Sequence, residues 1–106
     1  MPSVQAQLLV DFGVLNINHL GDLPVALQAF DDAVLLRPNN FNYRMVRAHA
    51  LLYLKEHERV EEEIKFLSGN RRWEDEFETP TAKIELLRQD LEASKNTPID
   101  SGDSDS

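Results

Sequence analysis

The sequence predicts an all-α fold built from short antiparallel helices. Residues that favour helix (Leu, Ala, Glu, Gln and Arg) are common, while the chain has only 4 glycines and few β-branched runs. Apolar residues recur at helical spacings through most of the sequence. Gly-Asp and Pro-Asn pairs interrupt these stretches as turns do. The 106 residues suit one small domain.

The first predicted helix runs from about residue 3 to residue 19. Ser3 is its expected N-cap, because a serine hydroxyl accepts hydrogen bonds from the free N–H groups of a first turn. Its apolar surface, which includes Phe12 and Leu15, is wide enough to be covered on more than one side. Gly13 costs roughly 1 kcal/mol relative to alanine inside a helix. We therefore expect a neighbouring helix to approach closely at this glycine.

A second helix is predicted to follow a tight turn and to end near Leu36. Gly21 favours the left-handed conformation that ends a helix. Asp22 is the expected N-cap of the next helix, and Pro24 falls in the first turn, where its missing N–H does no harm. Pro38 prevents the helix from continuing.

The inward face of this second helix alternates small and large side chains. Ala26, Phe30 and Ala33 lie at spacings that place them on one side of a helix. Small residues let a partner helix come close, while the phenylalanine fills the remaining space. The pattern predicts that another helix packs tightly against this one.

These features resemble the tetratricopeptide repeat, a helical hairpin of about 34 residues with the pattern A-x3-F…P near its end. The resemblance covers roughly Gln7 to Asn40. The first helix departs from the family, with Gly13-Val14 at the usual Leu-Gly pair. The aromatic and early Trp positions hold Ile17 and Val10. The residues that match the signature are Gly21, Asp22, Ala26, Phe30, Ala33 and Pro38.

A second helical pair resembles a degenerate unit of the same family. We expect helices over Tyr43–Lys55 and Glu58–Leu67, displaced by two or three residues relative to the first unit. In this alignment the Gly-Asp turn is replaced by His57-Glu58. The predicted boundaries are residues 3–40 for the first repeat and 41–69 for the second.

A capping segment is predicted over residues 71–93, which completes a domain of residues 1–93 with about five helices. Trp73 and Phe77 are four residues apart and would share a face of a helix. They would either cap the second unit or anchor a partner. After Pro80, the apolar residues Ile84, Leu87 and Leu91 form one narrow stripe on an otherwise polar helix. Such a stripe is typical of a terminal capping helix. Residues 94–106 predict a disordered acidic tail.

The resemblance implies a protein–protein interaction module: an adaptor, a scaffold or a small chaperone without catalytic activity. In this family the first helix of each repeat lines a groove that holds an extended peptide or a partner helix. The alternative is a structural subunit permanently buried in a larger assembly. Position by position, the expected partner-binding residues are Leu8, Asp11, Leu15, Asn18, His19, Arg44, Arg47, Leu51 and Lys55.

Composition argues against several other functions. A net charge of −8 disfavours nucleic acid and anionic membranes as partners. No apolar run approaches about 20 residues, so we expect no membrane insertion. The absence of cysteine excludes thiol catalysis and fits a reducing, cytoplasmic compartment. The start of the sequence lacks the basic and apolar regions of a secretory signal.

Enzymatic chemistry has little support in the sequence. No phosphate-binding loop or nucleophile motif occurs. His57 and Glu61 have the spacing of a helical metal-ligand pair, but such pairs arise readily in a Glu-rich helix. We therefore expect no catalytic residues, no metal and no cofactor. Stacked repeats usually need roughly three units for stability, so we also expect a homo-oligomer or an obligate partner to cover the first helix.

Overall fold

The computed structural model describes residues 2–96 and confirms the all-α fold class. Within this range the chain forms no strand. Residues 97–106, which hold most of the predicted acidic tail, lie outside the described residues. The elements in chain order are α1 (Pro2–Leu15) with its π-helical extension η1 (Asn16–Leu20), α2 (Leu23–Leu36), α3 (Phe41–Tyr53), α4 (His57–Gly69) and α5 (Thr81–Asn96).

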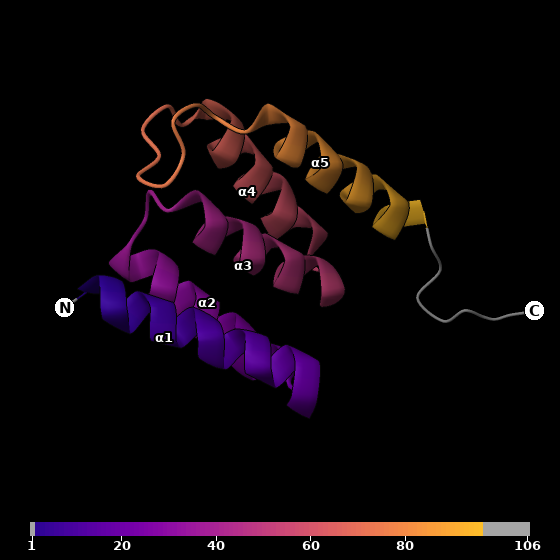
Figure 1. The fold of residues 1–106 in the computed structure, drawn as a ribbon. Helices are drawn as coiled ribbons and strands as arrows, with labels where there is room; N and C mark the ends of the chain where they lie inside the picture. The colour runs from indigo at the N-terminus through magenta and orange to yellow at the C-terminus, as the bar shows by residue number, and fades with distance from the viewer. Residues whose placement is uncertain (1, 97–106) are drawn as a thin grey trace, which may run out of the picture.

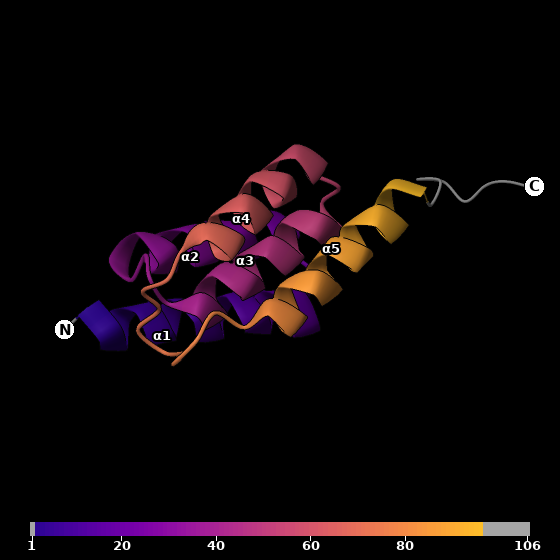
Figure 2. The same ribbon diagram turned by 90° about the horizontal axis from the view of Figure 1, so that it is seen from above.

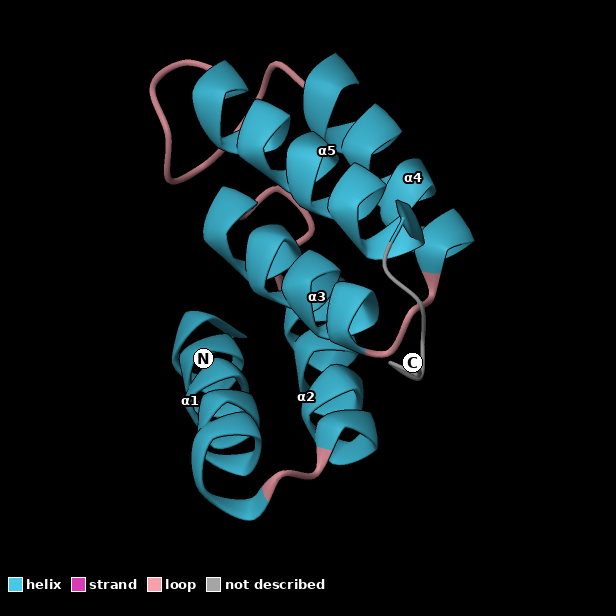
Figure 3. Cartoon of the chain, turned by 90° about the vertical axis from the view of Figure 1, so that its right-hand side faces the viewer, coloured by secondary structure: helices cyan, strands magenta, loops and turns pink. Residues whose placement is uncertain are grey.

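The helices form a stack in which each packs on the next in the chain (Figure 1). Helix α3 lies in the middle and contacts α2, α4 and α5. Helix α1 forms one end of the stack, and α4 and α5 form the other (Figure 3). Seen from above, α5 runs beside α3 (Figure 2). Among the described helices, none combines the length and apolar character that crossing a bilayer requires.

The first hairpin forms as the sequence predicts. Gly21 ends η1 in the left-handed conformation with φ 67°, and the Asp22 carboxylate accepts a hydrogen bond from the N–H of Val25 at 3.2 Å. Ala26 and Ala33 are fully buried in a core shared by α1, α2 and α3. One expectation is wrong: α1 already begins at Pro2, so Ser3 lies within the first turn and is not its N-cap.

The same backbone turn recurs one repeat later. Lys55 has φ 62° and, like Gly21, directly precedes the N-cap residue of a helix. These two positions lie 34 residues apart, the length of the repeat that the sequence resembles. The predicted turn at His57-Glu58 is therefore misplaced, because α4 begins at His57 and has Glu56 as its N-cap residue.

Burial follows the same period. Val60, Ile64 and Leu67 are the apolar residues that α4 buries. They stand 34 positions after Ala26, Phe30 and Ala33, which are the small-large-small face of α2. The second hairpin is thus in exact register with the first, without the predicted displacement of two or three residues.

The segment between α4 and α5 is not helical, so Trp73 and Phe77 do not share a helix face. Trp73 is 8% exposed and packs edge-on against the rings of Phe41 and Phe66, with centroids 5.1 and 5.9 Å away. Phe77 is fully exposed. The two interpretations of this pair therefore separate: Trp73 belongs to the core, and only Phe77 is free to contact a partner.

Helix α5 caps the stack with the predicted stripe, since Ile84, Leu87 and Leu91 are buried. It continues to Asn96, past the predicted domain end at residue 93. Near its C-terminal end, Ser94 receives a hydrogen bond from Lys55 Nζ at 3.1 Å. These contacts fix α5 across the end of the second hairpin.

Candidate functional site

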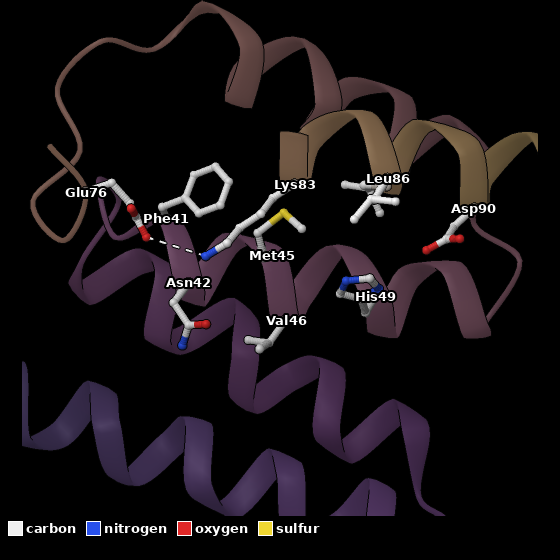
Figure 4. Close-up of a pocket in the computed structure, with 10 residues that line it drawn as sticks. Phe41, Asn42, Met45, Val46, His49, Glu76, Lys83, Leu86 and Asp90 are labelled. Carbon is white, nitrogen blue, oxygen red and sulfur yellow. Dashed lines mark ion pairs between the residues drawn. The ribbon is translucent and has the colours of Figure 1, made fainter. Parts of the chain in front are cut away.

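A groove of about 370 Å³ lies between α3 and α5 (Figure 4). This volume falls within the usual range of ligand pockets, about 300–1,000 Å³. The groove is half open along one side of the stack. Its walls come from the two helices and from the segment before α5. The lining residues are Phe41, Asn42, Met45, Val46, His49, Glu76, Lys83, Leu86, Leu87 and Asp90.

Each of the two helices turns one continuous face toward the groove. On α3 the face begins at Asn42 and continues with residues three, four and seven positions later, ending at His49. On α5 the same spacing runs from Lys83 to Asp90. Neighbours at these spacings lie above one another on a helix. Two such faces that oppose each other make a channel suited to an elongated ligand.

The middle of the groove is apolar. Leu87 is completely buried and forms part of the floor, while Leu86 remains half exposed at the edge. Met45 and Val46 approach from α3 (Figure 4). Methionine is unbranched and flexible, so its side chain adapts to varied apolar surfaces. This centre offers hydrophobic contact without a demand for one particular shape.

Charged groups stand at the two ends of the groove. Lys83 extends from α5 toward Glu76, and their charged atoms lie 3.7 Å apart (Figure 4). At the other end, His49 of α3 and Asp90 of α5 flank the opening (Figure 4). Asp90 has no ion-pair partner within residues 2–96. Its carboxylate is therefore free to meet a cation brought by a ligand.

The predicted binding residues on α1 are all at the surface. Leu8 is 62% exposed, and Leu15 about half exposed, with Asp11 between them. Asn18 and His19 in η1 are exposed as well. The five positions share the outer side of the first helix, but the groove between α3 and α5 does not include them.

The predicted binding residues on α3 do not face the groove. Arg44 and Arg47 lie on the α4 side, where both guanidinium groups bind the carboxylate of Glu63. Leu51 is 1% exposed and belongs to the core. Lys55 lies in the turn after α3 and bonds Ser94. None of the four lines the channel between α3 and α5. Arg44, Arg47 and Leu51 instead line a separate hollow of about 210 Å³ against α4.

The arginine cluster is a structural element with its charges already compensated. Glu63 is 5% exposed, and Arg44 Nη1 donates to it at 3.0 Å. Arg44 also lies 3.7 Å above the ring of Phe66, a favourable cation–π contact. Arg47 reaches Asp31 at 3.4 Å. With these partners in place, the cluster holds α2, α3 and α4 together.

The groove residues of α3 were missed because the second hairpin was predicted in the wrong register. With an offset of exactly 34 residues, Leu8, Asp11 and Leu15 correspond to Asn42, Met45 and His49. All three of the latter line the groove. The sequence did contain a signal for the correct register, because the buried residues of α4 follow those of α2 at a constant distance of 34 positions.

Other sequence signals find different roles. Trp73 is buried and is unavailable as an anchor for a partner. His57 Nε2 lies 2.9 Å from Ser94 Oγ, and Glu61 pairs with Lys95, so the candidate ligand pair makes other contacts. Residues 2–96 contain no cluster of three or more side chains that would hold a metal ion.

Comparison with known proteins gives no further guide to this site. No family model, no curated protein and no solved structure matches the chain.

Proposed function

We propose that this protein is a non-catalytic protein–protein interaction module of tetratricopeptide type, with the groove between α3 and α5 as its binding site. The exact 34-residue recurrence supports the family assignment, because it includes the left-handed turn at Gly21 and Lys55. A lysine gains nothing from a positive φ. Its presence there shows that the hairpin geometry imposes this conformation.

The single observation that carries the binding role is the groove itself. Two helix faces with the same spacing oppose each other over an apolar centre, with a free carboxylate at one end. Its ligand is an amphipathic segment, whose apolar side chains contact Met45, Val46 and Leu86. A basic side chain at one end of the segment meets Asp90. The net charge of −8 steers a basic segment toward this surface.

Phe77 extends the proposed site. It is fully exposed and directly follows Glu76, which lines the groove. Aromatic residues, phenylalanine included, are enriched in protein interfaces. In this role Phe77 covers the ligand from the loop side.

As a module of this kind the protein acts as a cytoplasmic adaptor, scaffold subunit or small chaperone. A permanent structural subunit is the second candidate. It is favoured by a separate observation, the apolar outer face of α1, where Leu8 and Phe12 are both at least half exposed.

The proposal is tested by titrating the full chain with amphipathic helical peptides that carry one leucine stripe. One series is lysine-rich and the other glutamate-rich. We expect binding of the lysine-rich series, weakening as salt rises. Leu86→Glu should reduce its affinity at least about tenfold, or 1.4 kcal/mol. Leu35→Glu is the matched control, since Leu35 is an exposed leucine on α2 outside the groove. Peptides that bind wild type and Leu86→Glu equally would refute the groove.

A further inference from the structure

Helix α1 presents an apolar face with nothing packed on it among the described residues. It forms one end of the stack (Figure 3). Val4, Leu8, Phe12 and Leu15 are each about half exposed or more. On a helix these residues follow one another at spacings of three and four, so they form a single stripe. A stripe of four large apolar side chains is more than the scattered exposure of an ordinary surface.

The same face contains both a hollow and a projecting side chain. Gln5, Leu8 and Leu9 of α1, together with Leu36 of α2, surround an open concavity of about 430 Å³. Phe12 is 50% exposed and lies one turn further along. Counted from Gln5, these α1 residues are at i, i+3, i+4 and i+7, so the hollow and the phenylalanine are on the same side of the helix.

Charge favours a second copy as the occupant of this face. The segment from Pro2 to Leu20 has one carboxylate, Asp11, and no lysine or arginine. The whole chain carries −8, so two copies repel each other over most of their surfaces. The face of α1, which has a single carboxylate, is a nearly neutral region where this repulsion is weak. A strongly basic partner would find almost no charge there to recognise.

We propose that two copies of this chain associate through α1 in an antiparallel pair about a two-fold axis, with Phe12 of each copy in the hollow beside Leu8 of the other. A two-fold axis perpendicular to two antiparallel helices brings the same side of each helix together. The projecting ring and the hollow are on that one side, about four residues apart. The axis then passes near residue 10, and Leu8 opposes Phe12 across it.

This interface is small, since one helix of each copy supplies most of it. It belongs at the low end of specific interfaces, and we expect a dissociation constant in the micromolar range. Asp11 lies within one turn of the axis, so the two carboxylates approach each other. Added salt should therefore strengthen the dimer, because it screens this repulsion and that of the net charge. Salt has the opposite effect on a basic peptide in the groove.

Sedimentation equilibrium of the full chain across micromolar concentrations tests the pairing. The wild type should dimerise, more strongly in high salt, and Asp11→Asn should tighten the dimer several-fold. Phe12→Glu should abolish it while the helical circular dichroism stays unchanged, because the side chain is half exposed. Leu86→Glu and Leu35→Glu are controls that keep the dimer. A wild-type chain that stays monomeric at several hundred micromolar, or a dimer that survives Phe12→Glu, would overturn the proposal.

Cysteine cross-linking tests the orientation, and the chain contains no cysteine that would interfere. The double variant Gln5→Cys/Leu15→Cys places thiols that meet only between antiparallel copies. Within one helix they are roughly 15 Å apart at 1.5 Å per residue, too far for a disulfide. Oxidation should give a covalent dimer with the double variant and none with either single variant. Efficient cross-linking of the single variants would show a parallel pair and overturn the antiparallel arrangement.

Discussion

The ring of Phe30 lies directly against the backbone of Gly13. A Cβ atom at residue 13 would lie 2.5 Å from Phe30 Cε1, which is closer than two non-bonded carbon atoms approach each other. The glycine thus permits α1 and α2 to pack at this short distance. Because the ring is 1% exposed and packed in the core of the first hairpin, it can move aside only by displacing its neighbours.

We predict that Gly13→Ala lowers the free energy of unfolding by about 1–3 kcal/mol, the usual cost of overpacking. The better helix propensity of alanine, worth about 1 kcal/mol, does not offset the clash. Gly69→Ala is the matched control, since a Cβ at residue 69 meets no atom within 4 Å. Urea denaturation measures both. If Gly13→Ala were as stable as wild type, the close approach would be wrong.

The carboxylate of Glu63 should be among the most sensitive polar groups in the protein. It is nearly buried between Arg44 and Arg47, and removing its charge leaves two guanidinium groups without their main partner. We predict that Glu63→Gln costs about 3 kcal/mol, as expected for breaking a buried ion pair from one side. Glu62→Gln, at the exposed neighbouring position, should cost less than about 0.5 kcal/mol. Equal effects in urea denaturation would contradict this role.

This cluster also shows why part of the site was beyond the reach of the sequence. Arg44 and Arg47 look like surface cations when α3 is considered alone. Their burial depends on Glu63, which is on another helix and becomes their neighbour only after the hairpin closes. Charge on a helix face does not reveal whether an opposite charge will cover it.

The first hairpin was predictable because its signals are local. The glycine turn and the N-cap define where α2 begins. The small-large-small face defines how closely another helix packs against it. The aromatic pair failed for the opposite reason. The spacing of Trp73 and Phe77 suits a helix, but Trp73 gains more from the rings of Phe41 and Phe66 on two other helices. Tertiary packing overrode the local pattern there.

Lys55 and Gly21 allow the turn geometry to be tested in both directions. Both have positive φ, which costs roughly 1 kcal/mol for a residue with a Cβ atom. We predict that Lys55→Gly stabilises the protein by about 0.5–1 kcal/mol, although it removes an exposed bond to Ser94. Gly21→Ala should destabilise it by about 1 kcal/mol. Thermal unfolding followed by circular dichroism should show shifts of opposite sign, and shifts of the same sign would exclude this explanation.

Tyr43 should make the protein sensitive to alkali. Desolvation raises the pKa of its phenol, and its hydroxyl donates to Gln7 Oε1 at 3.1 Å, joining α3 to α1. As pH rises through 10, the unfolded chain loses this proton while the folded chain keeps it, so stability falls. The variant Tyr43→Phe has no phenol to ionise at this position, so its stability should fall less than that of the wild type above pH 10. Ultraviolet titration of the wild type against Tyr43→Phe should show the phenol of Tyr43 ionising above its usual pKa.

Asp75 stabilises the start of α3 from a distant part of the chain. Its carboxylate accepts hydrogen bonds from the N–H groups of Phe41 at 2.7 Å and Asn42 at 3.0 Å. These are free donors at the positive end of a helix, where an anion is favoured. We predict that Asp75→Ala costs about 1–2 kcal/mol. Because Phe41 packs on Trp73, the emission of this single tryptophan should also shift to the red.

Glu78→Ala, a change at an exposed acid in the same loop, should alter neither the stability nor the emission. An unchanged emission spectrum in Asp75→Ala would show that the aromatic cluster holds α3 without this cap.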